Sequence, residues 1–84
     1  MSIDALMLRA TAYLALGRHA EAINDLDLVF EINPNNATAY ARRALAYTKL
    51  GQDAHVREDT DRAVDLGVAS AAMDRALEEI KQRR

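Results

Sequence analysis

The strongest constraint on the fold of this chain is that its sequence repeats after 34 residues. RATAYLALG, residues 9–17, returns as RALAYTKLG, residues 43–51. The repeated Ala residues can reflect composition alone, but Arg, Tyr, Leu, Gly and two Asp in one register indicate a duplicated unit. The identical pairs are Ala5/Ala39, Arg9/Arg43, Ala10/Ala44, Ala12/Ala46, Tyr13/Tyr47, Leu16/Leu50, Gly17/Gly51, Ala20/Ala54, Asp25/Asp59 and Asp27/Asp61. A fixed period of this length predicts stacked supersecondary units that bury their apolar faces against one another.

Each unit is predicted to be a helical hairpin. Residues 3–16 contain neither Gly nor Pro, and Ser2 can cap their N-terminus. Gly17 suits the left-handed residue that ends a helix, and Pro34 ends the next one. Apolar residues recur at helical spacing on both predicted helices: Leu6, Ala10, Tyr13 and Leu14, then Ala22, Ile23, Leu26, Val29 and Phe30.

The second unit follows the same design, and the tail departs from it. Residues 37–50 and 53–66 are predicted helices, separated by Gly51. Residues 70–84 match the repeat only at Ala71, yet Ser70 is a candidate N-cap. One face of this segment is apolar: Met73, Ala76, Leu77 and Ile80. We therefore expect one all-α domain of five helices, with repeats at 3–36 and 37–69 and a capping helix at 70–84.

The two units resemble the tetratricopeptide repeat. The matching stretches are AYLALGRHAEAINDLDLVFEINPNN and AYARRALAYTKLGQDAHVREDTDRAVDLG. The resemblance implies antiparallel hairpins stacked as a short right-handed α-solenoid. It assigns structural roles to Ala10, Tyr13, Gly17, Ala22, Pro34, Ala44, Tyr47 and Gly51. The second unit departs from the pattern at Val56, Thr60 and Val68, which predicts that it is the last unit of an array.

The repeated Arg and Asp predict ion pairs between helices. Arg9 and Asp25 lie equally far from the turn at Gly17, so they reach similar heights in a hairpin, and Arg43 and Asp59 do the same around Gly51. Each Arg is expected to pair with the Asp of its own hairpin, or Asp25 to reach Arg43 of the next. The alternative is a solvated pair worth less than about 1 kcal/mol.

Composition excludes several classes of function. A net charge of −2 with interleaved signs argues against nucleic-acid binding and a polybasic membrane anchor. No apolar run is long enough to span a membrane, and there is no signal peptide. The chain lacks Cys, which is compatible with the cytoplasm. His55 and Asp59 share a helix face without a third ligand, so neither metal, cofactor nor catalysis is expected.

The predicted function is therefore binding of a protein or peptide. In the family resembled, the first helices of successive hairpins line a concave groove. The candidate groove residues are Met7, Thr11, Leu14, Thr38, Arg42, Leu45 and Lys49. They suit a peptide or helix with apolar anchors and some acidic residues. The alternative is assembly of the parent protein or homo-oligomerisation through an exposed N-terminal edge made by Ile3, Leu6, Met7 and Leu8.

Overall fold

Five helices account for most of the residues that the structure describes. The computed structural model describes residues 1–83, and Arg84, which the predicted capping helix included, lies outside them. The helices are α1 (Ile3–Ala15), α2 (His19–Ile32), α3 (Ala37–Leu50), α4 (Asp53–Asp65) and α5 (Ser70–Arg83). The described residues contain no strand. The predicted all-α class is confirmed, with helix ends that differ by about one residue from the expected ones.

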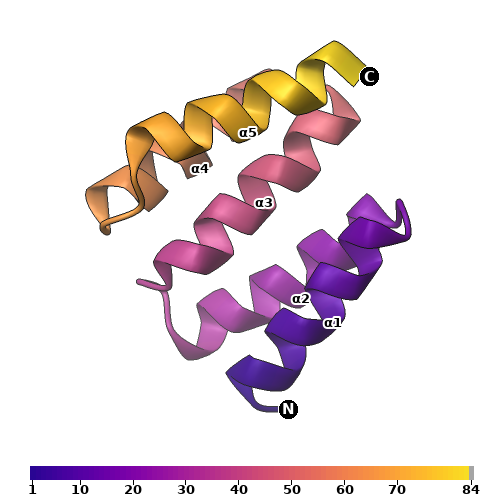
Figure 1. Cartoon of the computed structure of the whole chain (residues 1–84). Coiled ribbons are helices and arrows are strands. Elements are labelled where there is room, and N and C mark those ends of the chain that lie inside the picture. The colour runs from indigo at the N-terminus through magenta and orange to yellow at the C-terminus, as the bar shows by residue number, and fades with distance from the viewer. Residues whose placement is uncertain (84) are drawn as a thin grey trace.

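The helices form a stack of two hairpins and a final helix. α1 pairs with α2 and α3 with α4, while α2 packs on α3 to join the hairpins. Figure 1 shows α1, α3 and α5 on the near side of the molecule, with α4 behind α5. The Cα extents are 34 × 28 × 19 Å, which makes the stack a short slab. One face is thus built from the first helix of each hairpin together with α5.

Glycines with positive φ make the two hairpin turns. Gly17 has φ 77° and Gly51 has φ 75°, a conformation that costs other residues energy. The amide of Arg18 donates to the carbonyl of Tyr13 at 2.8 Å, and that of Gln52 to the carbonyl of Tyr47 at 3.0 Å. These bonds satisfy carbonyls at the helix ends in the Schellman arrangement. The echoed glycines therefore specify two equivalent turns.

The loop between the hairpins is held by its Asn and Pro residues. The side chain of Asn33 accepts from the amide of Asn35, and that of Asn36 accepts from the amide of Ala39 at 2.9 Å. The Tyr40 hydroxyl donates to the carbonyl of Pro34 at 3.1 Å. Asn36 is thereby the N-cap of α3. These contacts fix the direction in which α3 leaves α2.

Two predicted N-caps have different outcomes. The Ser2 hydroxyl accepts from the amide of Ala5 at 3.1 Å, as expected of an N-cap. α5, however, begins at Ser70 itself, and the first intrahelical bond runs from Met73 to the carbonyl of Ala69. Ser70 is therefore the first residue of the helix rather than its cap.

Small residues mark the places where helices cross. Ala10, Ala22 and Ala44 are all fully buried, as predicted for close helix crossings. The largest apolar side chains buried with them are Leu6, Leu26 and Val29. Ala10 belongs to a cluster with these three, and Ala44 to one with α4 and α5. A larger side chain at such a crossing would force the helices apart.

The prediction that the first helix has an exposed apolar edge is mostly wrong. Leu6 is buried, and Ile3 and Met7 pack against the cluster formed by α1, α2 and α3. Of the four residues expected at this edge, only Leu8 is largely exposed, at 73%. Leu16 is equally exposed, at 71%. The first helix therefore buries its N-terminal residues against its own hairpin, because α2 and α3 already cover that side.

The expected Arg–Asp pairs form within each hairpin. Arg9 donates from Nε and Nη2 to Asp25 at 2.8 and 2.6 Å, and Arg43 donates from the same nitrogens to Asp59, both at 2.8 Å. Both Asp side chains are only 5% exposed. Each carboxylate is therefore shielded from water, and the paired fork geometry supports directional hydrogen bonding.

Arg43 also joins the two repeats. Its Nη1 donates to Asp27 of α2 at 2.9 Å, so the contact between repeats uses Asp27 and not Asp25. The guanidinium carbon lies 4.5 Å from the centre of the Phe30 ring. The hydrogen bonds to Asp59 raise the pKa of Arg43 above its usual value, which burial only partly opposes. One side chain thus contacts α2, α3 and α4 through charge and an aromatic face.

The last helix docks differently from α3. Position 78, which corresponds to Ala44, is Glu78, and position 77, which corresponds to Arg43, is Leu77. Since a glutamate cannot replace a fully buried alanine at a crossing, α5 turns its Met73 and Leu77 inward instead. It packs chiefly on α3 and contacts α4 little. Sequence divergence in the tail therefore shifts α5 toward the near face.

Enlarging a crossing alanine should destabilise the fold. Ala22→Leu inserts three carbons where no side-chain surface is exposed, so the free energy of unfolding should fall by about 1–3 kcal/mol. Urea denaturation measures this change. Ala20→Leu, on the exposed side of the same helix, is the matched control and should change stability by under about 0.5 kcal/mol. Equal losses in both variants would contradict the crossing assignment.

The two carboxylates that contact Arg43 should differ in importance. Asp59→Ala leaves a largely buried guanidinium without its paired acceptor and should cost about 2–3 kcal/mol, since Arg43 keeps some solvent contact. Asp27 is 53% exposed, so Asp27→Ala should cost less than about 1 kcal/mol. Urea midpoints of both variants test the order. A larger loss for Asp27→Ala would show that the contact between repeats dominates.

Candidate partner-binding groove

A groove runs along the face formed by α1, α3 and α5. Its middle part, the central hollow, has a volume of about 330 Å³ and is lined by residues of all three helices. A second part, the outer hollow, has about 500 Å³ and lies between the N-terminal halves of α1 and α3. Thr11 and Arg42 line both hollows, so the two form one continuous groove.

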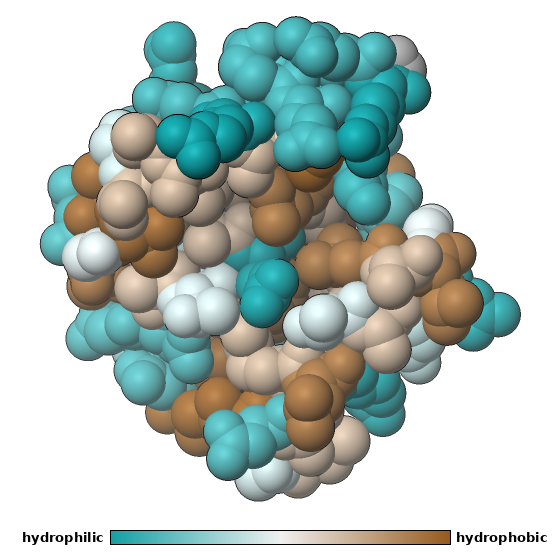
Figure 2. Space-filling view, in the orientation of Figure 1, coloured by the Kyte–Doolittle hydropathy of each residue, from teal (hydrophilic) through white to brown (hydrophobic). Residues whose placement is uncertain are grey.

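The central hollow combines apolar walls with basic groups. Its apolar residues include Leu14 from α1, Leu45 from α3 and Ile80 from α5. Lys49 and Arg83 stand toward the C-terminal ends of these helices, and Arg83 donates to Glu79 at 2.9 Å. Figure 2 shows this face, where pale and brown surface surrounds a small hydrophilic patch near the middle. The arrangement suits apolar side chains flanked by acidic groups.

Arg42 occupies the centre of the groove. Its side chain is half-buried and lines both hollows. Its Nε is buried and has no hydrogen-bond partner among residues 1–83. An unsatisfied buried donor costs free energy, which a ligand carboxylate or carbonyl would recover. Arg42 is therefore the group in this groove best placed to bind an acceptor.

The seven residues singled out from the sequence all line the groove. Leu14, Leu45 and Lys49 lie at the central hollow, Met7 and Thr38 at the outer hollow, and Thr11 and Arg42 at both. The Thr11 hydroxyl already donates to the carbonyl of Met7 at 2.9 Å, which leaves it as an acceptor for a ligand. The structure thus brings together on one surface residues that the repeat pattern placed on two separate helices.

Sequence reasoning missed the contribution of α5. Ala76, Glu79, Ile80 and Arg83 line the central hollow, whereas the predicted groove residues came only from the first helices of the two hairpins. Ala76 and Ile80 were assigned to the apolar face that covers the last hairpin. Helical spacing predicted that apolar face correctly, but it could not show that α5 would pack chiefly on α3 and place part of the face in the groove.

His19 lies at one end of the groove. Together with Lys49, Ile80 and Arg83 it lines a hollow of about 320 Å³. Its Nδ1 is buried and has no hydrogen-bond partner in the described part of the chain. Burial lowers the pKa of His19, and the nearby charge of Lys49 lowers it further. The neutral imidazole is therefore the favoured form in the folded protein.

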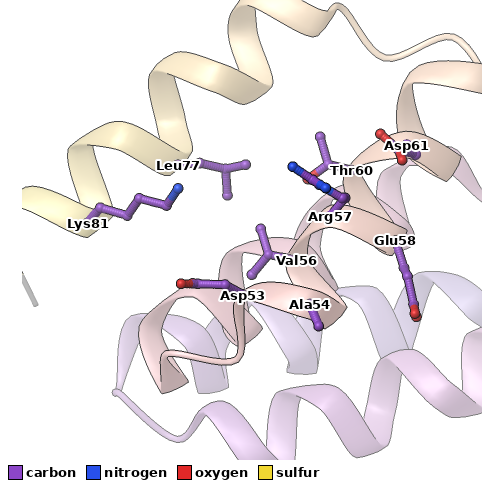
Figure 3. Close-up of a pocket in the computed structure, with 9 residues that line it drawn as sticks. All are labelled: Asp53, Ala54, Val56, Arg57, Glu58, Thr60, Asp61, Leu77 and Lys81. Carbon is purple, nitrogen blue, oxygen red and sulfur yellow. The ribbon is translucent and has the colours of Figure 1, made fainter.

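Another hollow, apart from the groove, lies between α4 and α5. It has a volume of about 680 Å³ and exists because α5 leans toward α3. In Figure 3, Val56 and Leu77 point toward one another across it and Lys81 extends along it, while Glu58 points away. The hydroxyl of Thr60 is buried there without a partner among residues 1–83. Its polar α4 wall reflects the departure of the second repeat from the first.

The suggested His55–Asp59 pair does not converge on a metal. His55 stacks on Tyr47 with ring centres 4.7 Å apart, and Asp59 is held by Arg43. Among the described residues, no cluster of three or more His, Cys, Asp or Glu side chains could hold a metal ion.

The described helices are also too short or too polar to cross a membrane.

Comparisons with known proteins agree with the architecture. A family model described as TPR repeat, the tetratricopeptide repeat, matches residues 10–51. The tetratricopeptide repeat and J domain-containing co-chaperone DNJ1 of Cryptococcus neoformans var. grubii serotype A is 35% identical over 83 residues, covering 83% of this chain and 16% of the relative. RNA polymerase II-associated protein 3 of Xenopus tropicalis is 32% identical over 74 residues, covering 88% of this chain. The second alignment spans 11% of RNA polymerase II-associated protein 3. The chain therefore corresponds to a small part of either relative.

The His19 environment predicts a dependence of stability on pH. Because the folded state lowers this pKa, the unfolded chain binds a proton more readily, and its imidazole titrates near about 6.5. The stability gained from neutral His19 is complete above that pH and is lost as the pH falls through the lowered value. His19→Gln should therefore lose less stability than the natural chain between about pH 7 and 5, measured by urea unfolding. Parallel profiles for the two proteins would contradict this account.

Proposed function

Since the chain belongs to the tetratricopeptide repeat family and is a protein-interaction scaffold, we propose that its groove binds a peptide or helix of a partner protein. The ligand carries apolar anchors for the central hollow and at least one acidic side chain for Arg42. The observation that carries this proposal is the buried, unpartnered Nε of Arg42, a residue that lines both hollows of the groove. No catalytic step is part of the proposal.

The shape of the groove favours a peptide over a small metabolite. Its hollows are open and distributed along three helices, so a ligand must be long enough to contact several shallow sites. Leu45 and Ile80 face the central hollow from α3 and α5, which suits one or two apolar side chains. An amphipathic helix or an extended segment can meet both requirements.

The charges of the groove favour acidic ligands. Lys49, Arg42 and Arg83 line the central hollow, and Glu79 is the one acidic residue among its lining residues. Glu79 is already paired with Arg83, so the positive side chains dominate what a ligand meets. Asp4 lies at the far end, on the outer hollow. This asymmetry predicts that an acidic group of the ligand lies nearer the C-terminal ends of α1 and α3.

Removing Arg42 should weaken binding selectively. The probe is a set of capped amphipathic peptides of about 15 residues with Leu pairs four residues apart and Glu beside them, titrated into isotope-labelled full chain by NMR. Shift changes should gather on Thr11, Leu45 and Ile80. Arg42→Ala should reduce the affinity about tenfold or more, because a hydrogen bond to a charged group is lost.

The matched controls separate the groove from general charge. Arg75→Ala removes an exposed Arg of α5 outside the groove and should leave the affinity unchanged. Peptides with Lys in place of Glu should bind more weakly, and added salt should weaken the Glu peptides more than uncharged ones. Shift changes spread over α2 and α4, or equal losses for Arg42→Ala and Arg75→Ala, would contradict the proposal.

A further inference from the structure

One end of the groove collects positively charged side chains from separate helices. A hollow of about 320 Å³, which we call the His19 hollow, is lined by His19, Lys49, Ile80 and Arg83. His19 begins α2, whereas Lys49 and Arg83 lie in the last turns of α3 and α5. In Figure 1 the turn before α2 and the C-terminal ends of α3 and α5 lie on the same side of the molecule. Among the described residues that line this hollow, none is acidic.

Lys49 and Arg83 occupy the same position of the repeat. They are 34 residues apart, and the corresponding residue of α1 is Ala15. Equivalent positions of successive helices lie near one another in a stack of repeats, so the two cations form a short basic row. Among residues 1–83, Lys49 belongs to no ion pair. Arg83 pairs with Glu79, but both side chains are more than half exposed, so this bridge is weak and a ligand anion can displace it.

The imidazole of His19 is the unsatisfied group of this hollow. The side chain is half-buried, and its Nδ1 has no hydrogen-bond partner in the described part of the chain. Because no bond holds this nitrogen there, the ring can turn it toward the hollow. The neutral imidazole can carry its proton on Nδ1 and donate it to an acceptor. A ligand oxygen would thus recover the free energy that the unpartnered nitrogen costs.

We propose that the His19 hollow binds a phosphoryl group carried by the partner peptide, with Lys49 and Arg83 balancing its charge and His19 donating a hydrogen bond. This inference rests on the proposed peptide groove and names a second chemical group of its ligand. Lys49, Ile80 and Arg83 line the central hollow as well as the His19 hollow. One peptide can therefore place apolar anchors in the first and a phosphorylated side chain in the second.

The number and origin of the donors favour a phosphoryl group over a carboxylate. A phosphoserine carries a charge of about −1.5 to −2 at neutral pH and three acceptor oxygens, whereas a carboxylate carries one charge and two oxygens. Donors that approach from α2, α3 and α5 can each take a different phosphoryl oxygen. A carboxylate would leave one of these donors unused, and Arg42 already offers it a place in the central hollow.

A free phosphate ion is the other source of this chemistry. Lys49 is exposed and the Arg83 side chain is 77% exposed, so water competes strongly for an ion that only these groups hold. A phosphoryl group on a peptide that is already bound in the groove meets the same side chains at a much higher effective concentration. We therefore expect tight binding only when the phosphoryl group is attached to a groove ligand.

The test uses the full chain and the amphipathic Leu and Glu peptides that probe the groove. Each peptide is made with phosphoserine, serine or aspartate one or two helical turns before or after the Leu pair. In at least one of these positions the phosphoserine peptide should bind about tenfold or more tightly than its serine counterpart, because hydrogen bonds to a charged group are gained. It should also bind more tightly than the aspartate peptide. Equal affinities for phosphoserine and aspartate at every position would overturn the proposal.

Variants assign the gain to the His19 hollow. The readout is the ratio of the affinities for the phosphoserine and serine peptides, so a general loss of groove binding or of folded protein cancels. His19→Phe and Lys49→Gln should each lower this ratio several-fold. Lys81→Gln, the matched control, removes a charge from α5 outside the His19 hollow and should leave the ratio unchanged. An equal decrease in all three variants, or no decrease in the first two, would overturn the assignment.

Inorganic phosphate separates the phosphoryl site from the peptide groove. Added at constant pH and ionic strength, it should shift the ring resonances of His19 and not those of His55, with an affinity about tenfold or more below that of the phosphopeptide. Binding as tight as that of the phosphopeptide would assign the hollow to a free ion and overturn the proposal. If serine peptides bind the groove and phosphorylation adds nothing, this inference fails and the peptide groove stands. If no peptide binds, the peptide groove fails, and this inference fails with it.

Discussion

The contact on which the rest of this fold depends is the one that Arg43 makes with two helices at once. Asp59 fixes it within its own hairpin, while Asp27 and Phe30 fix it to the preceding one. Apolar packing between alanine-rich helices is tolerant of sliding, whereas a forked guanidinium fits its carboxylates in one register. The ion pair therefore sets how far α3 lies along α2, and the turn glycines set how each hairpin closes.

The end of the repeat determines the shape of the candidate groove. α5 has Leu77 where α3 has Arg43, so it cannot use the same register-setting contact, and Glu78 forbids the same close crossing. It settles against α3 through Met73 and Leu77. This places Ile80 and Arg83 over the central hollow and leaves the side of α4 open. The loss of repeat identity in the tail is thus a cause of the groove geometry.

Much of this could be predicted from the sequence, because repetition fixes what is local and periodic. Helix ends, turn glycines and the pairing of Arg9 with Asp25 follow from spacing around each turn. The sequence did not indicate that Asp27 would join the repeats, since that depends on the rotation between hairpins. Nor did it give the position of α5, which is decided by tertiary packing of Met73 and Leu77 and not by helix propensity.

The rotation between the two hairpins also explains why the two sides of α1 and α3 differ in how well they repeat. Side chains on the near face of α1 and α3 are free to differ between repeats, and they do: Thr11 corresponds to Leu45, and Ala15 to Lys49. Side chains on the packing side must satisfy the same neighbour in every unit, so Arg9 and Arg43 remain identical although only the latter has its full set of contacts. Divergence between repeats is therefore found on the candidate groove, whereas Arg9 and Arg43 stay identical where they pair with an Asp of their own hairpin.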